Sequence, residues 1–275
     1  MREEQGPTPT RVASVARAAR LLALVASTPE DQRTAARIAR ALGKPLPTVY
    51  HLLSTLVDAR LLARDSNGCY HLGSAVGVLA DAYQRQAVPH PELLSRLTDL
   101  AGETQESAYL STWRQGDISI LAAREGTRAV RVASLRIGYY ENAHARASGK
   151  VLLAFTDPAD RVAYLAHHPL RPVTPRTIVD AGRFAEELEA VRLQGFATEL
   201  EEFTDGVCCL SVPVLAQDRL LAAYTISAPR GRFDESFSSY LDSLVRAASS
   251  AAGAVSGVSA TPVMADAERP ETAPS

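Results

Sequence analysis

The sequence predicts an α+β protein in which an N-terminal helix-turn-helix domain precedes a larger domain with an antiparallel sheet. Two helical patterns separated by a glycine occupy residues 34–59, and an Asn-Gly hairpin pattern follows them. Later in the chain, strand-like runs joined by tight turns alternate with helical stretches, which is typical of α+β domains. With 275 residues, the chain is long enough for two domains.

The first of the paired helices is predicted to end at Gly43, since glycine adopts the left-handed conformation past a helix C-terminus without a Cβ clash. Pro47 lies where the second helix would begin, because a first turn does not need its N–H. The apolar positions recur at helical spacing and predict an inward face of Ala35, Ile38, Ala39, Leu42, Val49, Leu52, Leu53 and Leu56.

The other face of the second helix carries groups suited to the major groove of DNA. Thr48, Tyr50 and His51 can hydrogen-bond to base edges or phosphates, and Ser54 and Thr55 continue this face. Taken alone, the pattern also fits two helices packed in an ordinary α domain.

The segment after this helix favours the DNA-binding reading. Residues 61–64 and 69–72 read as two strands, and Asp65-Ser66-Asn67-Gly68 between them is a strong hairpin signal. A helix-turn-helix followed by such a hairpin is a winged helix. Its first helix is predicted upstream, with an inward face of Val15, Ala18, Ala19 and Leu22.

Charge is divided unevenly along the chain. Residues 1–72 hold ten basic and six acidic side chains, a balance of +4, whereas the whole chain has a net charge of −2 and the remainder therefore −6. This asymmetry is expected if the first part meets phosphate and the second meets something else, although a solvated basic face gives the same count.

Composition argues against several classes of protein. No apolar run approaches the ~20 residues that span a bilayer, and the first residues lack the apolar core of a signal peptide, so we expect a cytoplasmic protein without membrane contact. Cys69, Cys208 and Cys209 are odd in number and have no metal-binding spacing, which speaks against a disulfide framework and a zinc knuckle. We expect no cofactor.

A connector and a second domain follow the hairpin. Residues 73–84 read as a helix, and Val88-Pro89-His90-Pro91 breaks it. The second domain is predicted to contain helices at 91–104, 148–155, 159–166, 181–194 and 233–255, and strands at 107–113, 117–123, 208–215 and 220–228. The last stretch, 257–275, is rich in Pro, Ala, Glu and Thr and is expected to be disordered.

The order and the amino-acid residues of these motifs resemble those of the IclR family of bacterial transcription regulators over about residues 11–256. The resemblance rests on Ser14-Val15-Ala16-Arg17-Ala18, Gly73, His144-Ala145-Arg146-Ala147-Ser148-Gly149-Lys150-Val151-Leu152-Leu153-Ala154, Gly195-Phe196-Ala197, Glu201-Glu202-Phe203, Gly206-Val207, Cys209 and Pro213-Val214.

The resemblance implies a winged helix-turn-helix domain at 11–72, a linker helix at 73–88 and a GAF-like effector-binding domain with an antiparallel sheet at 89–256. It also implies a regulator that binds double-stranded operator DNA as a homodimer or a dimer of dimers and responds to a small organic effector. We expect a repressor, and an activator is the alternative that the sequence leaves open.

The recognition helix departs from the pattern of the family. Lys44, Leu46, Pro47 and His51 stand where the family tends to have a leucine, a basic residue, a serine and an arginine. Each lost cationic contact to phosphate removes part of the salt-dependent affinity. DNA binding would then depend mainly on Arg17, Lys44 and Arg64. The alternative is a regulator-like protein whose degenerate helix-turn-helix no longer binds DNA and which acts as a metabolite or metal sensor.

By resemblance, the effector site consists of backbone donors at Ala147 and Ser148 and of the side chains of Glu199, Cys209, Thr225 and Ser227. Ala147-Ser148-Gly149 is expected to form a loop that precedes a helix, so that its free N–H groups and the helix dipole suit a carboxylate. Thr225 and Ser227 share one side of a strand, as we expect of Glu199 and Glu201.

Each of these side chains also has a plainer reading. Cys209 also fits a small buried hydrophobe, and the hydroxyls also fit a solvated strand face. The carboxylate of Glu199 would repel an anion unless it is protonated or paired, which points to a neutral, hydroxylated or basic effector.

Two rival classes are weaker. An enzyme would use Cys209 and His144 as nucleophile and base, but no motif supplies an oxyanion hole or a group that orients the base. A metal sensor would use His167, His168 and Cys208, although the two histidines lie where side chains often meet a helix C-terminus. We therefore expect neither catalysis nor a metal site.

Overall fold

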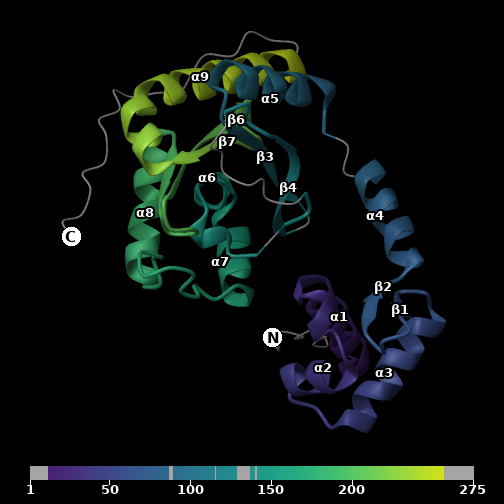
Figure 1. The fold of residues 1–275 in the computed structure, drawn as a ribbon. Coiled ribbons are helices and arrows are strands. Elements are labelled where there is room, and N and C mark those ends of the chain that lie inside the picture. Colours follow the sequence, from purple (N-terminus) through teal and green to yellow (C-terminus); the bar gives the residue numbers. More distant parts are fainter. Residues whose placement is uncertain (1–11, 87–88, 115, 129–136, 140, 257–275) are drawn as a thin grey trace, which may run out of the picture. The chain divides into compact units, whose positions relative to one another are not determined.

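The computed structural model describes residues 12–86, 89–114, 116–128, 137–139 and 141–256 (Figure 1). They form two compact units that divide between Val88 and Pro89. The segment 257–275, for which disorder is expected, lies outside the described residues. Among the described helices, none combines the length and the apolar character needed to cross a membrane.

The N-terminal unit is a winged helix-turn-helix followed by one more helix. Its elements are α1 (Ala13–Ser27), the short helix η1 (Glu30–Gln32), α2 (Ala35–Leu42), α3 (Leu46–Asp58), β1 (Leu62–Arg64), β2 (Tyr70–Leu72) and α4 (Ser74–Gln86). Gly43 ends α2 with a φ of 60°, and its N–H is donated to the carbonyls of Ala39 and Arg40. The two strands pair antiparallel across the Asn67-Gly68 turn, as the sequence predicts.

The inward face of α1 differs from the predicted one. Leu21 and Val25 are fully buried, whereas Val15 is 66% exposed. Of the predicted set, Ala18 and Leu22 pack only partly against the core. This helix carries apolar residues on several sides, so its periodicity alone does not fix which side faces α2 and β2. The faces of α2 and α3 agree with the prediction, with Ile38, Val49 and Leu53 at their centre.

The C-terminal unit is built on a five-stranded antiparallel sheet in the order β4-β3-β7-β6-β5. These strands are β3 (Ser107–Arg114), β4 (Asp117–Arg124), β5 (Ala197–Leu200), β6 (Val207–Ala216) and β7 (Arg219–Pro229). β5 ends at Leu200, and Glu201 has a φ of 62° in the turn that follows. The prediction that Glu199 and Glu201 lie on the same side of one strand is therefore wrong, because the chain leaves the strand between them.

Helices cover both faces of this sheet (Figure 1). α5 (Pro91–Thr104) and α9 (Arg230–Ser256) pack on one face, against alternate residues of β6 and β7 such as Leu210, Tyr224 and Ile226. The opposite face carries η2 (Ala143–Ala145), α6 (Ala147–Phe155), α7 (Pro158–His167) and α8 (Ala181–Gln194). The core on that side includes Ile118, Ala197 and Ala223. The predicted α+β class is confirmed.

Candidate functional site

The residues predicted to meet DNA lie on α1, α3, the turn before α3 and the wing of the N-terminal unit. Tyr50 is 45% exposed, and Thr48 is half-buried. Lys44 is exposed in the turn before α3, and Pro47 is exposed in the first helical turn of α3. The guanidinium of Arg64 lies 5.7 Å from the centre of the Tyr70 ring, beside the wing turn. The predicted residues that are exposed are Arg17, Lys44, Pro47, Tyr50, His51 and Arg64.

The wing is closed by a local network centred on Asp65. Its Oδ1 accepts the N–H groups of Asn67 at 2.9 Å and Cys69 at 2.8 Å, and His71 Nε2 lies 3.0 Å from Oδ2. The contact with His71 holds the pKa of Asp65 below its usual value. Arg33 approaches His71 Nδ1 at 3.4 Å, which favours the tautomer that donates from Nε2 to Asp65. We therefore interpret this group, which also lies near Glu30, as a structural link at the base of the wing.

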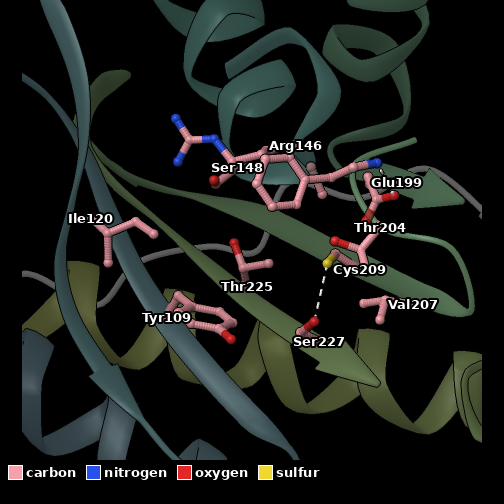
Figure 2. Close-up of a pocket in the computed structure, with 12 residues that line it drawn as sticks. Tyr109, Ile120, Arg146, Ser148, Glu199, Thr204, Val207, Cys209, Thr225 and Ser227 are labelled. Carbon is pink, nitrogen blue, oxygen red and sulfur yellow. Dashed lines mark hydrogen bonds between the residues drawn. The ribbon is translucent and has the colours of Figure 1, made fainter. Parts of the chain in front are cut away.

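The six residues predicted to bind an effector line one cavity between the sheet and α6 (Figure 2). The empty space in this cavity amounts to about 510 Å³ when its open mouth is included. Strand register explains why the side chains meet, because Glu199 pairs with Cys209 and Cys209 pairs with Ser227 across neighbouring strands. Directly paired residues point to the same face of a sheet, so these three form one row.

A second row lies beside the first and completes the sheet side of the cavity. Thr225 pairs with Ser211 on β6 and with Tyr109 on β3. Thr225 Oγ1 donates to Ser211 Oγ at 3.0 Å, and Cys209 Sγ lies 3.3 Å from Ser227 Oγ. The floor of the cavity therefore consists of short polar side chains that already bond to one another.

The N-terminal end of α6 forms the opposite wall. Ala147 and Ser148 belong to the first turn of α6, so the prediction that they form a loop ahead of the helix is corrected. Arg146 occupies the N-cap position, and its side chain makes no cap hydrogen bond. Gly149 is required here, because a Cβ would lie 1.9 Å from the carbonyl oxygen of Ala143. First-turn N–H groups and the helix dipole favour an anionic or carbonyl group at such a position.

Glu199 is the buried carboxyl of the cavity, with 1% of its surface exposed. Its Oε1 accepts the N–H groups of Glu202 at 2.5 Å and Phe203 at 3.0 Å. Its Oε2 is buried and accepts no hydrogen bond of ordinary geometry from the described residues. Burial raises the pKa of Glu199 to about 7, against the opposing effects of the Phe203 N–H and the Cys209 thiol. Near neutral pH, the carboxyl group of Glu199 is therefore protonated in some molecules, where it can donate a hydrogen bond, and ionised in others, where it only accepts.

Sequence reasoning missed half of the cavity lining. Arg146 is the most consequential, since it brings a side chain that is 4% exposed and stacks 5.2 Å from the centre of the Tyr139 ring. Burial lowers the pKa of Arg146. Its place beside Ala147 in the glycine-lysine motif was an available signal. The missed lining residues are Tyr109, Ile120, Arg146, Phe203, Thr204 and Val207.

The structure does not bring together the residues of a catalytic pair. His144 Nε2 donates to the carbonyl of Arg171 at 2.9 Å, and His144 is absent from the cavity lining around Cys209. Burial raises the pKa of Cys209 well above its usual value, which keeps it a protonated thiol.

The proposed metal ligands are also apart. His167 and His168 each bond through Nδ1 to a carbonyl of α7, at 2.9 Å. Cys208 faces the core under α5 and α9, on the other side of the sheet from α7. Over the described ranges, these three residues form no group of closely placed metal ligands.

Two family models match the chain. Residues 91–256 match the model described as bacterial transcriptional regulator IclR C-terminal, and residues 14–66 match the IclR helix-turn-helix domain. The protein named probable transcriptional regulator SauR, from Cupriavidus necator, is 31% identical over 80% of this chain and 87% of its own length. The transcriptional repressor AllR of Salmonella typhimurium is 29% identical over 72% of this chain and 73% of its own length.

Solved structures show the same fold. The IclR transcriptional regulator from Alicyclobacillus acidocaldarius has a TM-score of 0.68 at 24% identity and covers 89% of this chain and 99% of its own. An IclR homologue from Microbacterium hydrocarbonoxydans, crystallised with 4-hydroxybenzoate, has a TM-score of 0.65 at 22% identity, with 86% and 97% covered.

Proposed function

Because this chain belongs to the IclR family of bacterial transcriptional regulators, we propose that it is a repressor whose affinity for operator DNA is controlled by a small organic molecule bound in the C-terminal cavity. The family is one of regulators and not of enzymes, so catalysis is no part of the proposal. A protein that binds chromosomal DNA acts in the cytoplasm. The repressor role is supported by AllR, a named repressor of similar sequence.

The observation that carries the proposal is the convergence of the six effector-site residues on one cavity in the domain that does not hold the helix-turn-helix. They come from three strands and one helix. Strand register aligns Glu199, Cys209 and Ser227, and the first turn of α6 lines the same cavity. A regulator needs a ligand site of this kind apart from its DNA-binding surface if ligand and DNA are to influence each other.

The chemistry of the cavity suggests the class of ligand. An acceptor such as a carboxylate fits the first turn of α6 and the Arg146 side of the cavity. A hydroxyl or N–H donor fits Glu199 Oε2, which accepts no hydrogen bond of ordinary geometry from the described residues. Tyr109, Ile120 and Val207 supply apolar contact between these ends. A small hydroxylated acid satisfies both ends, and 4-hydroxybenzoate, bound by the Microbacterium homologue, is a suitable first probe.

The proposed DNA-binding form is a homodimer or a dimer of dimers. Two winged helices related by symmetry can read two half-sites one helical turn apart. On α4, Val78 is 67% and Leu79 is 61% exposed, and these apolar side chains offer a surface for a second copy of the chain.

Genomic footprinting of the bound protein, with and without candidate metabolites, tests the proposal. We expect protection of a few operators with paired half-sites, and loss or gain of that protection with one compound. Uniform binding along the genome, or none, would contradict specific DNA recognition. Operators that no metabolite affects would contradict the control by an effector.

A further inference from the structure

Lys150 is buried on α6 yet lies outside the cavity lining. It is 1% exposed, and its Nζ contacts Glu187 Oε1 on α8 at 2.9 Å. The same atom reaches the carbonyl of Thr198 on β5 at 3.1 Å and Glu202 Oε1 at 2.5 Å. An ammonium has three N–H donors, so these three acceptors use all of them.

The charge of Lys150 is retained in this buried place. Burial by itself would lower the pKa of Lys150, but the carboxylates of Glu202 and Glu187 raise it above its usual value. A buried charge is tolerated only where good partners surround it, and removal of one partner is strongly destabilising. Lys150 therefore ties α6, α8, β5 and the turn after β5 at one point.

The turn after β5 fixes the side chain of Glu199, which lies on β5. The N–H of Glu202 is donated to Glu199 Oε1, as is the N–H of Phe203. Glu201 lies between the end of β5 and Glu202, and it has a left-handed φ of 62°, which a residue other than glycine adopts at a cost in free energy. Such a turn persists only where its surroundings fix it. Thr177 Oγ1 donates to the carbonyl of Glu202 at 2.7 Å and supports it from outside.

We propose that Lys150 is a positioning residue for the cavity, which pins the turn at residues 201–203 and thereby holds Glu199 with one oxygen on that turn and the other available to a ligand. The inference deepens the proposed function, since it adds a residue on which the ligand site depends without contact. Phe203, the last residue of this turn, and Thr204, which follows it, line the cavity.

Amide hydrogen exchange measured by NMR on the full chain tests the inference without ligand or DNA. The test variant is Lys150→Met with Glu202→Gln, in which an unbranched side chain fills the space of the lysine stem. The control is Glu202→Gln alone, whose amide oxygen can still accept from Lys150. Both carry a neutral residue at 202, so they differ only in the ammonium.

We expect the Glu202 and Phe203 amides to exchange at least tenfold faster in the test variant than in the control, while amides in β6 and β7 stay within twofold. Local opening of one turn accelerates only its own amides, whereas a global loss of stability accelerates all of them. Equal acceleration of turn and sheet, or no acceleration of the turn, would overturn the inference. If the test variant does not fold, Lys150→Gln in the same background gives the same comparison. Failure here leaves the footprinting result untouched, so the two proposals fail separately.

Discussion

Replacement of Glu199 by Gln should remove a pH-dependent loss of stability from the C-terminal domain. The pKa of Glu199 is raised from its ordinary 4.5 to about 7 in the folded protein, chiefly by burial. Between these values the folded state binds more protons than the unfolded state, so this contribution to stability is complete below 4.5 and is lost as the pH rises through 7. At about 1.36 kcal/mol per pKa unit, the loss between about pH 5 and pH 8 amounts to roughly 2.5 kcal/mol.

The Gln variant has no charge to bury and should lack this loss. The free energy of unfolding can be followed by urea titration through Trp113, the single tryptophan of the chain, which packs 5.3 Å from Tyr164 in the C-terminal domain. We expect the stability of Glu199→Gln relative to wild type to rise by about 2.5 kcal/mol across that interval of pH. Glu235→Gln, at an exposed position on α9, is the control and should follow wild type. Parallel pH profiles for wild type and Glu199→Gln would refute the reasoning.

Three other changes test separate parts of the structure. Gly149→Ala places a Cβ 1.9 Å from Ala143 O, so we expect urea titration to show a loss above the roughly 1–3 kcal/mol of ordinary overpacking, and a variant of wild-type stability would contradict this close approach. Tyr50→Ala with His51→Ala should lower preference for the operator at least ~10-fold in mobility-shift assays and leave the melting temperature unchanged, and retained preference would exclude these side chains from recognition. Leu79→Lys should weaken dimers in light scattering, whereas a monomeric wild-type protein at micromolar concentration would contradict the proposed dimer.

Local signals in the sequence were sufficient for most of the fold. Gly43, Pro47 and the Asn67-Gly68 turn act through their own backbone preferences, and the structure shows helix ends and a hairpin at those places. The side of α1 that faces the core depends instead on what packs against it, and the prediction chose a side that includes the exposed Val15. The end of β5 at Leu200 depends on the turn that the distant Lys150 and Thr177 support.

The candidate site was predictable only where the resemblance supplied it. Thr225 and Ser227 can be paired by their alternation, but nothing local shows that Tyr109, more than 110 positions earlier, lies opposite Thr225. The network around Lys150 joins residues 37 to 52 positions apart and has no periodic signature. Such contacts follow from the tertiary fold.

The most direct test of the central claim is the affinity of the operator for the protein with and without the effector that footprinting identifies, measured for wild type, Glu199→Gln and Ser227→Ala. We expect the effector to change the operator affinity of wild type about 5- to 150-fold, and operator DNA to change effector affinity by the same factor. Glu199→Gln should weaken an effector that donates to the carboxylate and strengthen a purely anionic one, as calorimetry would show. If both variants keep the wild-type affinity for the effector and the wild-type coupling to DNA, the effector binds elsewhere and the account of this cavity is contradicted.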